Sequence, residues 1–151
     1  MCKIILMEEN DWNVIDPTAE EVHATFRLSH ETLVPQDISN ALELDPSHSH
    51  RKGDRNLGKE GREYTPYKIG VWTFSSKGKL ASTDLNEHIN WVLTKLDKKK
   101  EIIKEYQDNG FQSDVFCFWS AKCDNTCPGL SKESVKLLAN LDLEIWIDVY
   151  L

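Results

Sequence analysis

The sequence has no long hydrophobic run. Its first apolar stretch, residues 4–7, is followed at once by Glu8 and Glu9. Such a stretch is too short to form the core of a signal peptide or a helix that spans a membrane. We therefore expect a soluble chain of the cytoplasm that does not enter a membrane.

Cysteine and basic residues are also scarce. The four cysteines lie far apart except for Cys123 and Cys127, and a reducing cytoplasm would keep them as thiols. The chain carries 18 lysines and arginines against 25 aspartates and glutamates, which gives a net charge of −7. Because nucleic acids are bound by clustered cations that neutralise phosphates, this balance predicts no nucleic-acid partner.

Two sequence fingerprints of known chemistry are missing. No serine stands in a nucleophile-elbow motif, and no glycine-rich stretch leads into Lys-Ser or Lys-Thr at the start of a helix, as a phosphate-binding loop would. What is present is a chain of 151 residues, 40% hydrophobic and 28% charged. That size and composition are typical of one globular unit, so we expect a single domain over 1–151.

Hydrophobic periodicity predicts four strands. Apolar and polar residues alternate over 22–29 and 143–151, β-branched and aromatic residues mark 71–76, and large apolar residues occupy both faces of 111–120. Three helical regions lie between them. They are predicted from Pro35 as a first helical residue, from the cap at Asp84 with a break near Asp97, and from the cap at Ser131.

The order strand, helix, strand, long helix, strand, helix, strand contains one unit twice. With right-handed crossovers, each copy becomes a split β-α-β half. Together they predict an α+β, ferredoxin-like sandwich, in which a four-stranded, mostly antiparallel sheet carries helices on one face. The long helix joins the two halves in place of a middle hairpin.

Several separated motifs stand in the order of a known family. They are Asp45-Pro46, Arg51-Lys52-Gly53-Asp54, Gly70-Val71-Trp72-Thr73-Phe74-Ser75-Ser76, Leu85-Asn86-Glu87-His88-Ile89-Asn90-Trp91-Val92-Leu93 and Cys117-Phe118-Trp119-Ser120. With the closing strand, they make the chain resemble the bacterial domain-of-unknown-function family numbered 4279 over about residues 22–151. The resemblance implies a bacterial, cytoplasmic protein with an N-terminal extension over 1–21. It carries over no activity and no catalytic residue.

A long polar connection, residues 47–70, is the most basic part of the chain. Between residues 48 and 68 there are six bases against three acids, whereas residues 1–47 contain ten acids against two bases. Connections of this length are usually functional or mobile. The residues that we expect to hold a ligand or partner here are Arg51, Lys52, Asp54 and Arg55.

Three interpretations of this basic loop stay open. Guanidinium and backbone N–H groups around Gly53 would suit a carboxylate or a phosphate. Alternatively, Arg51 or Arg55 pairs with acidic strand residues such as Glu144 or Asp148 and pins the loop to the sheet. The third interpretation is a solvated loop without a specific role.

Aromatic residues form a second feature. Three pairs each fall on a single face of their strand, namely Trp72 with Phe74, Phe116 with Phe118, and Trp146 with Tyr150. A bare aromatic face is uncommon, so we expect the N-terminal segment and the basic loop to cover it, or a partner such as a second copy of the chain to bind it. We expect Trp72, Trp119 and Trp146 to make the contacts.

The remaining reactive residues show weaker patterns. His48, His50, Cys123 and Cys127 are zinc-competent side chains, but His-x-His and Cys-x3-Cys are not the usual zinc spacings, so we expect no metal and no cofactor. A nucleophile needs an adjacent base and a third group that orients the base. The candidates for such an arrangement are Ser75, Ser76, Cys117, Ser120, His88 and Glu87, and no motif joins them.

The sequence thus supports three hypotheses. The first is a non-catalytic binding module that holds a protein partner or a small anionic ligand on the aromatic face and the basic loop. An immunity-like role would suit its size, charge and bacterial setting. The others are a small hydrolase or metal-dependent enzyme that uses residues 48–55, and a structural homodimer.

Overall fold

The computed structural model describes residues 19–122 and 127–151. Within these ranges the fold is α+β, with four α-helices, a five-stranded sheet in the order β2-β5-β1-β6-β7, and a two-stranded hairpin. The strands are β1 Ala19–His30, β2 His48–His50, β3 Asn56–Leu57, β4 Glu63–Tyr64, β5 Gly70–Ser75, β6 Gln112–Ala121 and β7 Glu144–Tyr150. The helices are α1 Pro35–Leu42, α2 Leu85–Asp97, α3 Lys100–Asp108 and α4 Lys132–Asn140.

The helix boundaries follow the local sequence signals. The Asp84 carboxylate accepts a hydrogen bond from the N–H of Asn86 at 2.9 Å and caps α2, and the Ser131 hydroxyl caps α4 by accepting from Ser134 N–H at 3.1 Å. The predicted break near Asp97 is confirmed, because α2 ends there and α3 begins at Lys100. No helix in the described ranges is long and apolar enough to span a membrane.

The sheet is mixed, and the ferredoxin-like prediction is not confirmed. β1 lies antiparallel to both β5 and β6, β2 lies antiparallel to β5, and only β6 and β7 are parallel. The predicted β1-α1-β5 half is therefore an antiparallel pair of neighbours instead of a split parallel unit. The cause is β2, a short polar strand that the periodicity did not reveal, because it adds one reversal of chain direction before β5.

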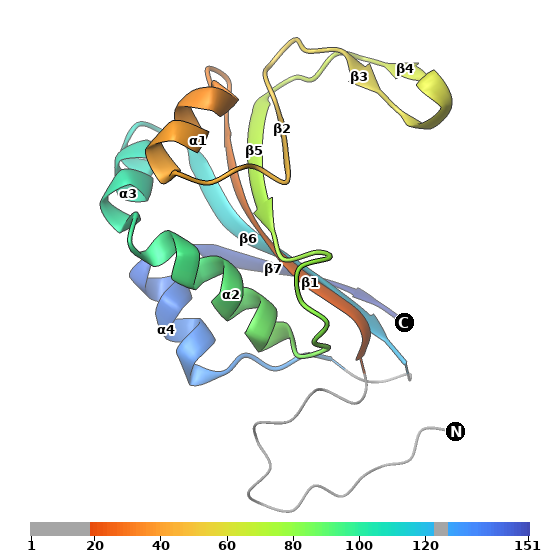
Figure 1. Ribbon diagram of the computed structural model, residues 1–151, viewed down its shortest axis with the longest axis vertical. Helices are drawn as coiled ribbons and strands as arrows, with labels where there is room; N and C mark the ends of the chain where they lie inside the picture. The colour runs from red at the N-terminus through yellow and green to blue at the C-terminus, as the bar shows by residue number, and fades with distance from the viewer. Residues whose placement is uncertain (1–18, 123–126) are drawn as a thin grey trace, which may run out of the picture.

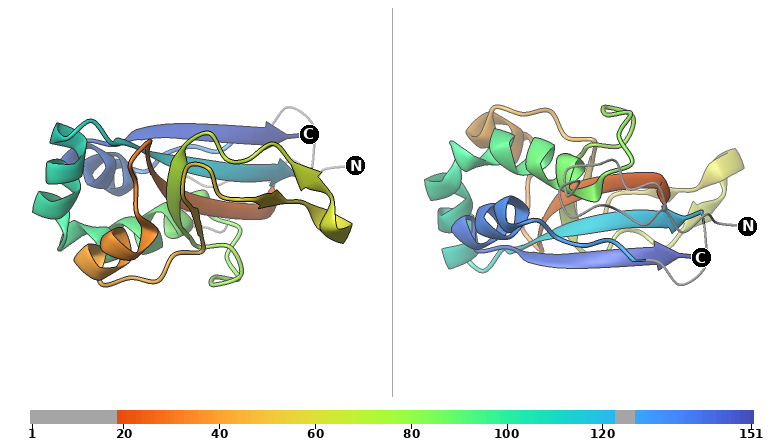
Figure 2. Two further views of the ribbon diagram at one scale, coloured as in Figure 1. Left: turned by 90° about the horizontal axis from the view of Figure 1, so that it is seen from above. Right: turned by 90° about the horizontal axis from the view of Figure 1, so that it is seen from below.

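All four helices lie on the same side of the sheet, as Figure 1 shows. The views in Figure 2 place β7 at the outer edge, where it pairs with β6 alone. α2 packs against β1 and α4, and the buried core lies between these helices and the sheet. The β3–β4 hairpin projects away from this body.

The prediction that Trp72 lies on an exposed aromatic face is wrong. Trp72 is opposite Leu28 of β1, and Trp119 is opposite Val22. These registers turn both indoles toward the helices, where neither is exposed at all (0%). Neither indole can therefore contact a partner at the surface.

Candidate functional site

The sheet face that points away from the helices is uncovered in the described structure, and we call it the open face. Its side chains follow from the strand registers, which place Arg27, Asp114 and Glu144 in one row and Thr25, Phe116 and Trp146 in the next. A third row holds His23, Phe118 and Asp148. The open face therefore combines aromatic rings with charged groups.

An arginine clamp lies at the centre of the open face. Arg27 Nε and Nη2 each donate a hydrogen bond of 2.7 Å to the Asp114 carboxylate, and the guanidinium carbon lies 4.9 Å from the centre of the Phe116 ring. The bond to Asp114 raises the pKa of Arg27 further, so its charge is permanent. In the sequence, this pair is visible only as two polar positions on two strands.

Aromatic rings continue from Phe116 toward the end of β7. Phe118 stacks on His23 with ring centres 5.1 Å apart, and its other neighbour is Tyr150 at 4.9 Å. Trp146 and Tyr150 are 58% and 52% exposed. The predicted surface position of Trp146 is thus confirmed, whereas its predicted companions Trp72 and Trp119 lie in the core.

Beside Trp146 lies a hollow of about 640 Å³, which we call the acidic hollow. Its lining residues are Arg27, Gln107, Phe111, Gln112, Ser113, Asp114, Asp142, Glu144 and Trp146. Three carboxylates stand against one guanidinium, and that guanidinium is already bonded to Asp114. The hollow therefore favours a positively charged group.

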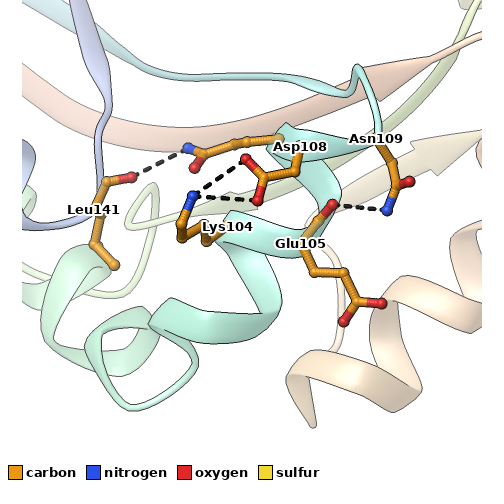
Figure 3. Close-up of polar contacts among 6 residues, drawn as sticks. Lys104, Glu105, Asp108, Asn109 and Leu141 are labelled. Carbon is orange, nitrogen blue, oxygen red and sulfur yellow. Dashed lines mark hydrogen bonds and ion pairs between the residues drawn. The ribbon is translucent and has the colours of Figure 1, made fainter.

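Gln107 fixes the wall of this hollow on the side of α3. Its Nε2 donates to Ser113 Oγ at 2.8 Å and lies 3.1 Å from the Leu141 carbonyl and 3.2 Å from the Asp142 carbonyl. Figure 3 shows the end of α3, where Lys104 pairs with Asp108. The dashed line to Leu141 is the hydrogen bond that its carbonyl accepts from the Gln107 amide. α3 thereby holds the turn that leads into β7.

The basic loop lies at the other side of the molecule. Asp54 accepts a hydrogen bond of 2.7 Å from Arg51 N–H, and Lys52 lies 3.2 Å from Glu31. Arg55 pairs with Glu63 of the hairpin at 3.1 Å. The alternative in which Arg51 or Arg55 pairs with Glu144 or Asp148 is wrong, because β2 and β7 are opposite edges of the sheet.

The two histidines of β2 face each other on the open face. His48 Nε2 lies 3.0 Å from His50 Nδ1, and the His50 ring stacks on Tyr67 with centres 3.5 Å apart. The described residues contain no group of three metal-binding side chains. Of the two cysteines proposed beside them, Cys127 is exposed and Cys123 lies outside the described ranges.

The structure brings two hydrolase candidates together, but inside the core. His88 Nε2 donates to the Ser82 carbonyl at 2.7 Å, which leaves Nδ1 to accept from the Ser76 hydroxyl at 2.7 Å. Ser76 also accepts from Ala24 N–H at 2.9 Å, and both side chains are buried. Burial also raises the pKa of the Cys117 thiol to about 12, so it stays protonated at neutral pH.

We expect stability to depend on pH through His23. Burial and the nearby positive charge of Lys77 hold the pKa of this imidazole below 6.5 in the folded chain. The unfolded chain therefore binds more protons just below pH 6.5, and stability should fall as the pH drops through that value. His23→Phe, which keeps the stack on Phe118, should flatten this dependence in urea titrations between pH 7.5 and 5. If the pH dependence of stability is unchanged in this variant, His23 is not its cause.

Together these features define a class of protein: a mixed-sheet α+β domain with helices on one face and an aromatic, net acidic open face on the other. The chain belongs to the family described as a domain of unknown function, DUF4279, whose model matches residues 20–151. This confirms the resemblance seen in the sequence. No curated protein and no solved structure matches the chain.

Proposed function

We propose that this chain is a non-catalytic binding module of the bacterial cytoplasm, which holds a protein partner on its open face. The observation that carries the proposal is the exposed pair Trp146 and Tyr150, beside Phe116 and Phe118 on a sheet face that no described element covers. A few residues carry most of the binding energy at protein interfaces, and tryptophan, tyrosine and arginine are enriched among them. The open face presents all three: Arg27 and Trp146 lie in adjoining rows, and Tyr150 lies two rows beyond Trp146.

The buried chemistry supports binding over catalysis. A substrate on the surface would not reach Ser76 or His88, and Cys117 is a protonated core thiol. Binding on the open face needs none of these groups. The Ser76–His88 pair is accounted for by the hydrogen bonds that it completes between β1, α2 and the loop after β5.

The charges favour a protein partner over a small anion. Two cations of the basic loop, Lys52 and Arg55, already face the chain's own carboxylates, Glu31 and Glu63, while the acidic hollow beside Trp146 favours cations. A basic protein surface would satisfy both the aromatic rings and the carboxylates. An immunity-like role against a basic toxin is one form of this function, and a toxin gene next to this one would support it.

A peptide-display selection tests the proposal. The full chain is immobilised, a random twelve-residue library is selected against it, and the affinities of the selected peptides are measured by fluorescence anisotropy. We expect a recurrent sequence whose binding weakens at least tenfold on Trp146→Ala, since truncation of a central aromatic typically costs about 2 kcal/mol or more.

Tyr64→Ala is the matched control, because Tyr64 is similarly exposed, at 48%, but lies on the hairpin. It should leave the affinity unchanged. The proposal is wrong if no recurrent sequence appears, or if the selected peptides bind the Trp146→Ala variant as tightly as the parent chain.

A further inference from the structure

β7 is a free sheet edge whose only charged side chains are acidic. It pairs with β6 in an unbroken register from Glu144 to Tyr150, and no described strand pairs with its other side. Natural edge strands are commonly blocked by lysine, proline or a bulge, and β7 contains none of them. Alternate backbone N–H and C=O groups along it are therefore available to another strand.

An apolar groove accompanies this edge on the side of the helices. It has a volume of about 470 Å³ and runs between α4 and β7. Its apolar lining includes Val135, Leu138, Leu143 and Ile145. Val135 is 48% exposed there, so apolar side chains of an added strand would find a surface to cover.

On the open face, the same edge is negative. Glu144 and Asp148 project from β7, and among the described residues neither has an ion-pair partner. Asp142 precedes them in the acidic hollow. A strand added here would therefore meet apolar groups on one face and carboxylates on the other.

We propose that the free edge of β7 accepts an extended segment of a partner protein as a sixth strand, and that this segment alternates apolar residues with lysine or arginine. Its apolar side chains occupy the α4–β7 groove, and its cations lie over Glu144 and Asp148. Strand addition of this kind takes affinity from backbone hydrogen bonds and specificity from alternate side chains. The inference rests on the proposed function, because it names the partner that also covers Trp146.

Charge selects this occupant over two others. A second copy of the chain would oppose β7 with another β7, whose charged residues, Glu144 and Asp148, are both acidic. The chain's own residues 1–18 contain four acids and a single base, Lys3. A basic segment of another protein is the occupant that complements the carboxylates.

The probe for this test is a labelled eight-residue peptide that alternates valine and lysine, with aspartate replacing lysine in a control peptide. We expect the lysine peptide to bind the full chain in anisotropy measurements and the aspartate peptide not to bind. Two further versions carry N-methyl groups on alternate residues. One pattern should abolish binding and the other should preserve it, because only alternate N–H groups of a strand face its neighbour.

Variants of the chain test the carboxylates. Glu144→Lys with Asp148→Lys should weaken binding of the lysine peptide at least tenfold. Glu101→Lys with Glu105→Lys, two exposed charge reversals on α3, changes the net charge by the same amount and is the matched control, which should leave binding unchanged. Equal effects of the two N-methyl patterns, or of the β7 and α3 variants, would overturn the inference.

The outcomes also separate this inference from the proposed function. If the lysine peptide does not bind while display-selected peptides still require Trp146, the strand-addition inference fails and the proposed function stands. If neither binds, both fail. A dimer in light scattering that Asp148→Lys dissociates would assign the edge to a second copy. Tighter peptide binding after Ile5→Pro would assign it to the chain's own N-terminal segment, and either result overturns the inference.

Discussion

Trp72→Ala is expected to lower the free energy of unfolding by about 3–5 kcal/mol, the usual range for removing a large buried aromatic side chain. Trp72 is completely buried, packs edge-on against Phe26 with ring centres 6.4 Å apart, and stacks near Phe74. Its Nε1 donates a hydrogen bond of 3.0 Å to the Ser39 hydroxyl of α1. Alanine would leave a cavity and an unpaired hydroxyl. Urea denaturation followed by circular dichroism measures the loss.

Trp146→Ala provides the matched control for that experiment. It removes the same side chain from a position that is 58% exposed, so stability should change by less than about 1 kcal/mol, as is usual for surface substitutions. The two variants also distinguish two roles, although the sequence predicts partner contacts for both tryptophans. Trp72 should matter for folding and Trp146 for binding. Similar losses of stability at both positions would contradict the registers described for β5 and β7.

His88→Ala is expected to cost about 2–4 kcal/mol, because it opens a cavity and leaves buried polar groups unpaired. The imidazole joins the Ser76 hydroxyl to the Ser82 carbonyl, with both contacts at 2.7 Å. The side chains of Ser76 and His88 are both inaccessible to water, which would otherwise replace the lost bonds. Chemical denaturation of the variant at neutral pH provides the measurement.

A double-mutant cycle tests whether the contact between Ser76 and His88 causes this loss of stability. Ser76→Ala alone should also destabilise, because Ala24 N–H loses its acceptor. Residues in direct contact show coupling energies of about 0.5–3 kcal/mol, so the double variant should be less unstable than the sum of the two single variants predicts. Purely additive losses would show that the two side chains act independently.

Periodicity located four of the seven described strands, β1, β5, β6 and β7, but did not orient all of them. Val71, Trp72 and Phe74 place apolar groups on both faces of β5, so the sequence alone offered no reason to turn Trp72 inward. Its pairing with Leu28 settles the orientation, and that pairing depends on a register between strands more than 40 residues apart. In β7, strict alternation with Glu144 and Asp148 gave the correct face directly.

The sheet topology depended on a strand with almost no signal. β2 consists of His48, Ser49 and His50, and it is held at an edge by its register against Val71 and Thr73. Three polar residues cannot show an apolar period, so periodicity predicts a loop over 47–70 and does not reveal this strand. Without β2, the sequence also allowed the basic loop to lie near β7. In the structure the two lie at opposite edges of the sheet.

The candidate site was predictable only in its aromatic part. Trp146 and Tyr150 could be assigned to one surface from a single strand. The acidic hollow is assembled from β1, the end of α3, β6 and the turn before β7, and no local pattern brings Arg27, Gln107 and Asp142 together. Such sites depend on tertiary geometry, which a single sequence does not reveal.

The opposite placement of the basic loop and β7 makes the molecule an electric dipole that lies across its sheet. The positive end is the region after β2, with Arg51 and Lys52, and the negative end is the edge that carries Glu144 and Asp148. In the field of a charged partner, a dipole of this kind turns the molecule before contact is made. A basic partner would therefore meet the β7 edge first, and added salt would slow that encounter by screening the orienting field.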